Sequence, residues 1–416
     1  MPTSASAARA AVSTLSVDDA LARILARIEP LAPTQVGLLD ALGAVLTEDA
    51  SADRDIPPFR NSAMDGYAVR GADVAQDGAT LRVVGAVAAG AMPERTVGAG
   101  EAMRIMTGAP IPEGADTVVR VEDTDNGAEV VTITTATPRG MAVRQAGEDL
   151  KRGEVVLARG TLLRQAEIGV LASIGQAKVN VVRRPNVAVL STGDELVDID
   201  EEPGPGKIRD ANRYSLAAAV RATGCAAFEL GIARDSADDL RHALGNAAFG
   251  DLVVTSGGVS VGDHDYVKPV VDAMGQMDFW SIALRPGRPL AFGELRTKRG
   301  AVPIFGLPGN PVSALLTFEL FVRPALLKMA GRTKLQRPRA QARMLDRVDK
   351  PVGLRTFARG IYDEAAGTVR TTGPQGSNIL RSMALANALI DLPESLASAG
   401  PGDTVNVVLT DRPEDH

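Results

Sequence analysis

Residues 251–269 read Asp251-Leu-Val-Val-Thr-Ser-Gly-Gly-Val-Ser-Val-Gly-Asp-His-Asp-Tyr-Val-Lys-Pro269, and this stretch decides the fold. Leu252–Thr255 is a short apolar, β-branched run, typical of a strand buried on both faces of a parallel sheet. The run breaks into Ser256-Gly257-Gly258, where the backbone can approach a ligand closely. Acidic residues and a helical pattern follow, and a strand, a glycine-rich turn and a helix start form ligand sites in open α/β sheets. The stretch therefore predicts such a site; the alternative is a glycine-rich connection with solvated acids.

The sequence on both sides of this stretch alternates between strand and helix patterns. Strands are expected over residues 186–191, 228–232, 252–255 and 302–305, with helices at 212–223 and 236–248 between them. An antiparallel pair is expected at 280–285 and 289–293, and Asn310 with Pro311 should begin a last helix that Pro324 kinks or ends. This alternation predicts a doubly wound parallel α/β domain over residues 184–333.

The remainder of the chain predicts three further domains. Residues 1–50 and 148–183 carry helical periodicity and are expected to form one discontinuous helical domain used for dimerisation. A Val/Thr-rich and Gly-rich segment interrupts it and predicts a β-rich insert over residues 51–147. Within the insert, strands at 118–121 and 130–134 are expected to form a hairpin through Asp125-Asn126-Gly127. Short alternating segments at 334–416 predict a small C-terminal β-barrel-like domain.

Composition excludes several functional classes. The net charge of −6, one tryptophan and four tyrosines argue against a nucleic-acid-binding protein. Cys225 is the sole cysteine, and the three histidines fit no zinc-ligand spacing, so a bound metal should be a hard cation held by carboxylates. No apolar run approaches the ~20 residues needed to cross a bilayer, and no signal-peptide pattern is present, so we expect a cytoplasmic protein without membrane or nucleic-acid partners.

The carboxyl ends of three predicted parallel strands should meet at one edge of the sheet. In open α/β sheets, ligands bind beyond this edge. Glycines and a helix start there can bind phosphate through backbone N–H groups, and carboxylates beside a phosphate site favour Mg²⁺. The sequence thus predicts a nucleotide or pterin-type phosphate ligand with Mg²⁺; the alternative is that the acids are helix caps or solvated charges. Arg285 and Arg288 flank a tight turn near this edge. They predict a second anion site; the alternative is that they are solvated surface arginines. The acids are Asp194, Glu195, Asp263 and Asp265, and the ligand-contacting positions are Ser256, Gly257, Gly258, Ser260, Gly262, Pro308, Gly309 and Asn310.

Five motifs resemble the molybdopterin molybdenumtransferase family, called MoeA in bacteria and present as the E domain of gephyrin. They are Pro58-Phe-Arg-Asn-Ser-Ala-Met-Asp-Gly-Tyr-Ala-Val69, Met106-Thr-Gly-Ala-Pro-Ile-Pro112, Ser191-Thr-Gly-Asp-Glu-Leu196, Thr255-Ser-Gly-Gly-Val-Ser-Val-Gly262 and Gly306-Leu-Pro-Gly-Asn-Pro-Val-Ser313. They occur in the family's order over nearly the whole chain. The resemblance implies four domains, a homodimer, and Mg²⁺-dependent insertion of molybdate into adenylated molybdopterin with release of AMP.

The resemblance also implies roles for single residues. Glu195 and Asp265 match the acidic pair that handles Mg²⁺. Asp65 and Thr107 match essential positions of the family's β insert, which faces the α/β domain of the other subunit. Around molybdate the matching residues are Arg285, Arg288, Ser313, Arg359 and Ser377, with arginines at two positions where many members have lysines; Asp149 and Asp235 match further family acids.

Two other functions fit parts of the same sequence. A molybdopterin adenylyltransferase would use the same α/β domain on ATP, but the related family consists of that single domain. A non-catalytic scaffold, as in gephyrin, is the second alternative. The implied partners are the substrates, a second copy of the chain and other proteins of the cofactor pathway, including the adenylyltransferase.

Overall fold

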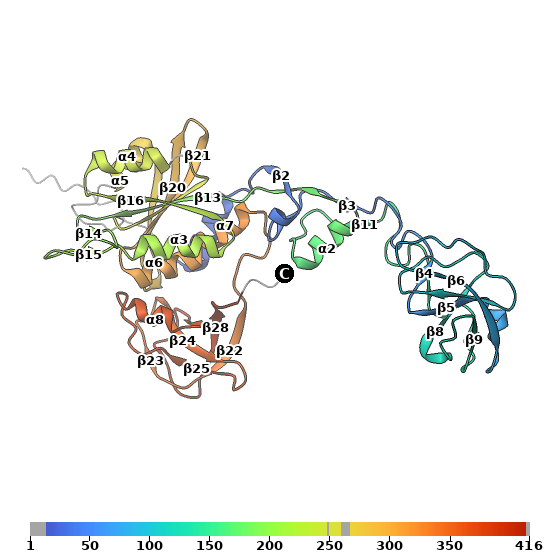
Figure 1. The fold of residues 1–416 in the computed structure, drawn as a ribbon. Helices are drawn as coiled ribbons and strands as arrows, with labels where there is room; N and C mark the ends of the chain where they lie inside the picture. Colours follow the sequence, from blue (N-terminus) through green and yellow to red (C-terminus); the bar gives the residue numbers. More distant parts are fainter. Residues whose placement is uncertain (1–13, 248, 259–266, 413–416) are drawn as a thin grey trace, which may run out of the picture. The chain divides into compact units, whose positions relative to one another are not determined.

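The computed structural model describes residues 14–247, 249–258 and 267–412. By its contacts the chain separates into two compact units (Figure 1). One contains residues 1–35, 43–47 and 180–416, and the other contains residues 36–42 and 48–179. This division is coarser than the four predicted domains, whose boundaries stay a prediction.

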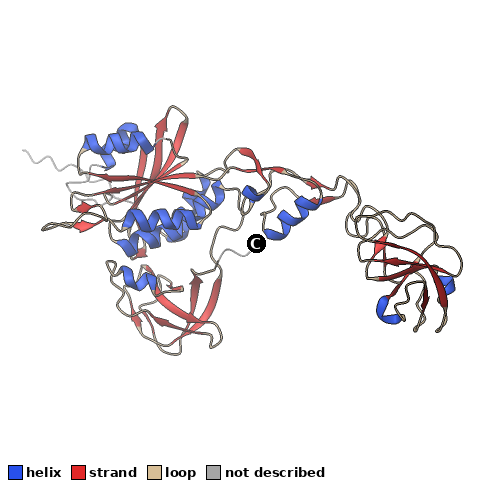
Figure 2. Ribbon diagram, viewed as in Figure 1, coloured by secondary structure: helices blue, strands red, loops and turns tan. Residues whose placement is uncertain are grey.

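A seven-stranded sheet forms the centre of the first unit, in the order β1-β18-β20-β21-β17-β13-β16 (Figure 2). The four strands from β21 to β16 are parallel, as predicted, whereas β20 runs antiparallel to both of its neighbours. The predicted antiparallel pair thus extends the same sheet, which is mixed and not wholly parallel. The strands are β1 (Thr14–Leu15), β13 (Asn186–Thr192), β16 (Ala226–Ala233), β17 (Leu252–Ser256), β18 (Gly275–Ile282), β20 (Pro289–Thr297) and β21 (Gly300–Leu307).

Helices cover both faces of this sheet because side chains alternate along each buried strand. On β13, Val187 and Val189 belong to one apolar cluster, and Ala188 and Leu190 belong to another. The first cluster packs against α1 (Val17–Ala26), α3 (Asn212–Ala222), α6 (Pro311–Thr317) and α7 (Arg323–Met329). The second packs against α4 (Ala237–Ala247) and α5 (Val267–Met274).

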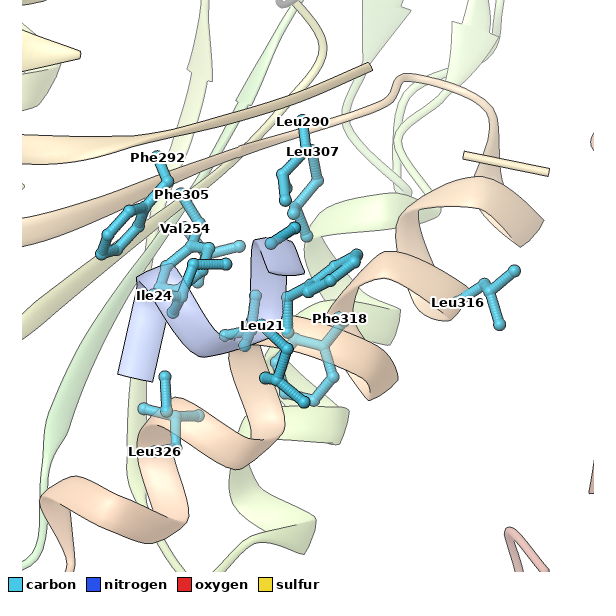
Figure 3. Packing of buried hydrophobic residues seen from close by; sticks show 14 of the residues in the cluster. Leu21, Ile24, Val254, Leu290, Phe292, Phe305, Leu307, Leu316, Phe318 and Leu326 are labelled. Carbon is cyan, nitrogen blue, oxygen red and sulfur yellow. The ribbon is translucent and has the colours of Figure 1, made fainter. Parts of the chain in front are cut away.

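Helix α1 was expected to share a domain with the helical segment near residue 170, but it packs on the sheet. Leu21 and Ile24 belong to the same apolar cluster as Phe292 and Phe305 (Figure 3). The amphipathic pattern that predicted the helix is therefore explained by burial against the α/β core. Ser16 caps α1, since its hydroxyl accepts the Asp19 N–H at 3.0 Å.

The last helix of the α/β part ends its first α-helical stretch at Thr317, shortly before Pro324. A π-helical turn, η4 (Phe318–Val322), joins α6 to α7, and Pro324 lies in the first turn of α7, where its missing N–H costs no helical bond. Asn310 is the N-cap of α6, but its side chain makes no capping bond.

The C-terminal part forms a closed barrel, in agreement with the prediction. Its sheet has the order β19-β24-β25-β22-β28-β26, and β24 also pairs with β26. The elements are β19 (Leu284–Arg285), β22 (Arg339–Met344), β23 (Val348–Asp349), β24 (Arg355–Asp363), β25 (Thr368–Thr371), α8 (Leu380–Ala384), β26 (Ala388–Leu392), β27 (Ser398–Ala399) and β28 (Thr404–Leu409). Strand β19 comes from the α/β part, so that part and the barrel share a strand pair.

The second unit is built on a five-stranded sheet, in the order β8-β5-β7-β6-β9, which confirms the β-rich insert. Strands β8 and β9 lie at opposite edges, so the predicted hairpin is wrong: β8 pairs with β5 instead, and Asp125 binds the N–H groups of Gly127 and Thr132 in a wide turn. Its strands are β5 (Gly66–Val69), β6 (Thr80–Val87), β7 (Glu101–Ile105), β8 (Thr117–Arg120) and β9 (Val130–Thr132), with α2 (Gln165–Ser173) beyond them. Shorter elements are η1 (Leu39–Ala41), β3 (Ala50–Ser51), β4 (Asn61–Ser62), η2 (Gly71–Asp73), η3 (Val121–Asp123), β10 (Val143–Arg144) and β11 (Val155–Leu157).

The chain crosses between the units beside two paired strands, β2 (Pro33–Gly37) and β12 (Lys178–Val182). A small parallel pair, β14 (Leu196–Val197) and β15 (Ile208–Arg209), lies after β13 in the first unit. No helix among the described residues is long and apolar enough to cross a membrane.

Candidate functional site

Three loops that follow parallel strands meet at one edge of the central sheet. The Gly257 N–H donates to the Leu307 carbonyl at 3.0 Å, joining the loops after β17 and β21. Gly257 has a φ of 93°, and a Cβ there would lie 2.5 Å from the Thr192 carbonyl oxygen. Only glycine therefore allows these loops to approach so closely. The predicted convergence of the three strand ends is confirmed for the described part of each loop.

Asn212 ties two of these loops together. Its Nδ2 donates to Ser256 Oγ at 2.8 Å and to the Gly309 carbonyl at 2.7 Å. The sequence predicted only that a helix begins here; Asn212 is the first residue of α3, and its amide reaches both loops at the strand ends. Asparagine at a helix start is common enough that nothing in the sequence marks this second role.

The acidic loop after β13 carries two of the predicted acids, Asp194 and Glu195. Glu195 is exposed, and its carboxylate folds back over Gly193, where a Cβ would lie 2.4 Å from Glu195 Oε2. The Asp194 N–H donates to Asp235 Oδ2 at 3.3 Å, and the Asp235 N–H donates to Asp194 Oδ1 at 3.2 Å. The structure thus brings Asp235 to the predicted loop.

Four of the predicted site residues, Ser260, Gly262, Asp263 and Asp265, lie outside the described residues. Among the residues that are described, no three acidic or histidine side chains form a group that could hold a metal ion by themselves. The described acids therefore offer a partial set of ligands at the strand ends.

An open cavity of about 640 Å³ lies beside these loops, between the α/β part and the barrel. Arg285 and Arg288 contribute from the turn before β20, and Arg359 contributes from β24. Pro308, Asn310, Ser313 and Ser377 line the same cavity. The structure thus brings together every residue that the resemblance placed around molybdate, although Arg285 and Ser377 lie far apart in the sequence.

Arg359 is the largest fully buried side chain of the described residues, with 1% of its surface exposed. Its Nε donates to Ser382 Oγ at 2.9 Å, and its Nη2 donates to the Gly376 carbonyl at 3.0 Å. No carboxylate of the described chain pairs with it, and burial lowers its pKa to about 10, so it stays protonated at neutral pH. A buried, unpaired guanidinium on a cavity wall requires a counter-charge that an anionic ligand can supply.

Three other arginines near the cavity, Arg355, Arg285 and Arg288, differ from Arg359 in their hydrogen-bond and ion-pair partners. Arg355 donates to Asp391 Oδ1 and Oδ2 at 2.8 and 2.7 Å, so its charge is already neutralised inside the barrel. Arg285 and Arg288 are exposed at the cavity and make no ion pair within the described chain. The one hydrogen bond given by Arg288 there runs from its Nε to Ser281 Oγ, at 3.0 Å. The cavity therefore combines three guanidiniums without carboxylate partners among the described residues.

In the second unit, Asp65 and Thr107 form one hydrogen-bonded pair. Asp65 Oδ1 accepts the Thr107 N–H at 2.7 Å and the Thr107 hydroxyl at 2.8 Å. The backbone bond first, then the hydroxyl and Arg104, hold the pKa of Asp65 below its usual value. Arg104 was not among the predicted site residues, and a single arginine within a strand gives no sequence signal for such a role.

Asp149 is exposed, and its backbone N–H donates to the Ile56 carbonyl at 2.9 Å. Within the described chain, its side chain makes no hydrogen bond to the Asp65–Thr107 pair. Its role stays a prediction from the resemblance.

Comparison with known proteins agrees with this arrangement. Three family models match: the MoeA N-terminal region, domains I and II, at residues 15–175; a probable molybdopterin binding domain at 188–328; and the MoeA C-terminal region, domain IV, at 341–410. A molybdopterin molybdenumtransferase of Haemophilus influenzae is 37% identical over 400 residues, covering 94% of this chain and 98% of that relative. The chain belongs to the molybdopterin molybdenumtransferase family.

Other members of the family support the same assignment. Molybdopterin molybdenumtransferase 2 of Mycobacterium tuberculosis is 39% identical over 389 residues, covering 90% of this chain and 94% of that protein. The crystal structure of a molybdopterin biosynthesis MoeA protein from Pyrococcus horikoshii OT3 matches with a TM-score of 0.80 and 30% identity, covering 95% of this chain and all of that one. The fold predicted from the resemblance is thereby confirmed.

Proposed function

We propose that this chain inserts molybdate into adenylated molybdopterin, releasing AMP, as a step of molybdenum cofactor biosynthesis. The observation that carries the proposal is the cavity with three guanidiniums that lack carboxylate partners in the described chain, next to three converging strand ends. Tetrahedral oxyanions are bound in proteins by such arginines together with hydroxyl donors.

The residues of the cavity would bind and orient the oxyanion. Arg359 supplies a fixed charge from a buried position, while Arg285 and Arg288 supply charge from its exposed side. Ser313 and Ser377 add hydroxyls along the same wall. Because Arg359 stays protonated at neutral pH, it would hold the oxyanion without any change in its own protonation.

The converging loops would bind the phosphate-bearing end of the pterin substrate. Gly257, Gly258 and Gly309 present backbone close to the strand ends, and Asn212 keeps their loops at a fixed separation. The loops and the cavity adjoin each other, since Pro308 and Asn310 belong to the loop after β21 and also line the cavity. A ligand held at the loops would therefore place its other end at the bound oxyanion.

Magnesium fits the acids near the strand ends, since it needs only one or two carboxylates when substrate phosphate and water complete its shell. Glu195 is the described residue that would hold it, with Asp265 as the second ligand implied by the resemblance. When bound, the ion would neutralise charge on the phosphoanhydride. Asp194 and Asp235 are occupied with each other's backbone N–H groups.

The resemblance further suggests a homodimer in which Asp65 and Thr107 of the β insert take part in the reaction. Both are exposed in the second unit, and Thr107 fixes the Asp65 carboxylate as an ionised acceptor. Sedimentation of the chain at micromolar concentration is expected to give a dimer. A monomer at this concentration would remove the second copy from the proposed site.

The decisive experiment incubates the chain with adenylated molybdopterin, Mg²⁺ and molybdate. We expect AMP release that depends on molybdate and on Mg²⁺. Consumption of ATP with unadenylated molybdopterin would instead indicate the adenylyltransferase alternative. If the chain binds these substrates but catalyses neither reaction, the result contradicts an enzymatic role.

A further inference from the structure

The side chain of Gln375 takes the place of a missing strand beside Arg359. Strand β25 pairs with β24 as far as Gly360 and Thr371, and the next bond runs from the Thr372 N–H to the Arg359 carbonyl at 3.0 Å. There β25 ends, and the Arg359 N–H has no strand partner. Gln375 Oε1 accepts this N–H at 2.8 Å, and Gln375 Nε2 donates to the Arg359 carbonyl at 3.2 Å. The amide thus satisfies both backbone groups of one residue.

The loop that carries Gln375 also holds the Arg359 guanidinium. Gln375 Nε2 donates a second bond to the Gly373 carbonyl at 2.9 Å, which closes the loop on itself. The next residue, Gly376, accepts Arg359 Nη2 at 3.0 Å, and the Ser377 carbonyl accepts the Val312 N–H of α6 at 3.1 Å. Backbone, guanidinium and cavity wall are therefore connected through one short loop.

We infer that Gln375 is a positioning residue that sets the direction in which the Arg359 guanidinium meets the oxyanion. This inference rests on the proposed function. Without the amide, the Arg359 N–H loses its acceptor in a buried site, and the loop loses the bonds that keep Gly376 within reach of Nη2. The backbone of Arg359 and the Gly376 contact of its guanidinium would then relax together. Gln375 also lines the cavity, but its amide is taken up by the Arg359 backbone and the Gly373 carbonyl.

The test measures binding of molybdate alone to the full-length chain by isothermal titration. Gln375→Met keeps the length of the side chain and removes both hydrogen-bonding groups, and we expect molybdate binding to weaken about tenfold. The half-saturating concentration of adenylated molybdopterin in the AMP assay should stay unchanged. Gln341→Met is the matched control, because Gln341 lies exposed on β22 of the same barrel, away from the Arg359 loop.

The outcomes separate this inference from the proposed function. If the parent binds no molybdate, or if Arg359→Met binds as the parent does, the proposed function fails. If Arg359→Met loses binding while Gln375→Met keeps the parent's affinity, only the positioning role of Gln375 is overturned. Equal weakening for molybdate and for the pterin substrate would indicate general loosening and would also overturn it. Should Gln375→Met not fold, Gln375→Asn, which is too short to reach both groups, is expected to show the same selective loss, and parental affinity in this variant would overturn the inference.

Discussion

Arg359 combines two properties that oppose each other. Its guanidinium is buried without a carboxylate partner in the described chain, and such a charge destabilises the folded state. The same side chain lies on the wall of the cavity that Arg285 and Arg288 also line. Proteins retain such a charge where a ligand uses it. Stability and binding should therefore respond in opposite directions when it is removed.

Arg359→Met is expected to leave the melting temperature unchanged or to raise it, because an apolar side chain of similar length replaces an unpaired buried charge. Molybdate binding should fall by at least about tenfold, the equivalent of one charge-assisted hydrogen bond. Thermal unfolding and titration of the same sample measure both effects. Arg343→Ala, an exposed arginine on β22, is the control. A large loss of stability would show that Arg359 is a structural residue.

Arg288 should act on molybdate more than on the pterin, because its guanidinium reaches the cavity from the exposed side. In Arg288→Ala we expect the half-saturating molybdate concentration to rise several-fold at fixed pterin, with little change in stability. AMP release against molybdate concentration measures this, and Arg296→Ala on β20 is the control. An unchanged half-saturating concentration would mean that Arg288 only belongs to a surface turn.

Thr107 should tune Asp65 in the β insert. Thr107→Val removes the hydroxyl bond and keeps the backbone bond, which contributes more to the lowered pKa. The pKa of Asp65 is therefore expected to rise toward its usual value while remaining below it, and Thr107→Ser should leave it unchanged. Carbon-13 titration of labelled aspartate, assigned with Asp65→Asn, measures the shift. A pKa that does not move in Thr107→Val would contradict the observed pairing.

At the scale of elements, helix α2 depends on one carboxylate. Glu167 accepts the Arg164 N–H at 2.9 Å and pairs with Arg164 Nη2 at 2.6 Å, and these contacts lower its pKa from 4.5 to about 2. A carboxyl whose pKa is lower when folded stabilises the fold above about pH 4.5, and this stabilisation is lost as the pH falls from 4.5 through 2.

Glu167→Gln should therefore lower the free energy of unfolding at neutral pH by about 1–2 kcal/mol, a value reduced for the exposure of Arg164. Between pH 4.5 and 2 the difference between variant and parent should shrink, because the parent's carboxyl becomes protonated. Denaturant unfolding at several pH values measures this. Glu129→Gln, which changes an exposed acid of the β insert, is the control variant.

Elements with a strong local pattern could be predicted from the sequence. The buried strand at 252–256 and the helix after Asn310 follow from hydrophobic run, glycine and proline alone. The hairpin through Asn126 was wrong because a local turn signal cannot show that β5 would take the place beside β8. Likewise, the cavity residues were expected from the resemblance, but the contacts of Asn212 and Gln375 depend on loops that meet only in the folded chain.

At the scale of the whole molecule, the long segment 48–179 of the second unit leaves the first unit and returns to it at one strand pair. Residues 45–47 and 180–182 run antiparallel: Leu46 pairs with Val181, and the Thr47 N–H donates to the Asn180 carbonyl at 3.0 Å. The two ends of the excursion 48–179 are thus held next to each other by the first unit. The apolar clusters of the five-stranded sheet are formed by residues within 67–143, so they do not depend on the first unit's core.

This geometry allows the excursion to be removed. Replacing residues 48–179 by Asn-Gly, a two-residue turn that favours antiparallel hairpins, should join Thr47 to Asn180 without strain. We expect the shortened chain to unfold cooperatively and to bind molybdate with the parent's affinity, because every residue of the cavity lies in the first unit. It should release no AMP, since Asp65 and Thr107 are absent.

Calorimetry, molybdate titration and the AMP assay on the shortened chain test these three expectations separately. Segment 36–42 loses its bond to Ala177, so a modest drop in melting temperature is compatible with the prediction. A folded chain that no longer binds molybdate would show that the cavity needs the β insert to form. Persistent AMP release would remove Asp65 and Thr107 from the reaction and would leave the β insert without a catalytic role.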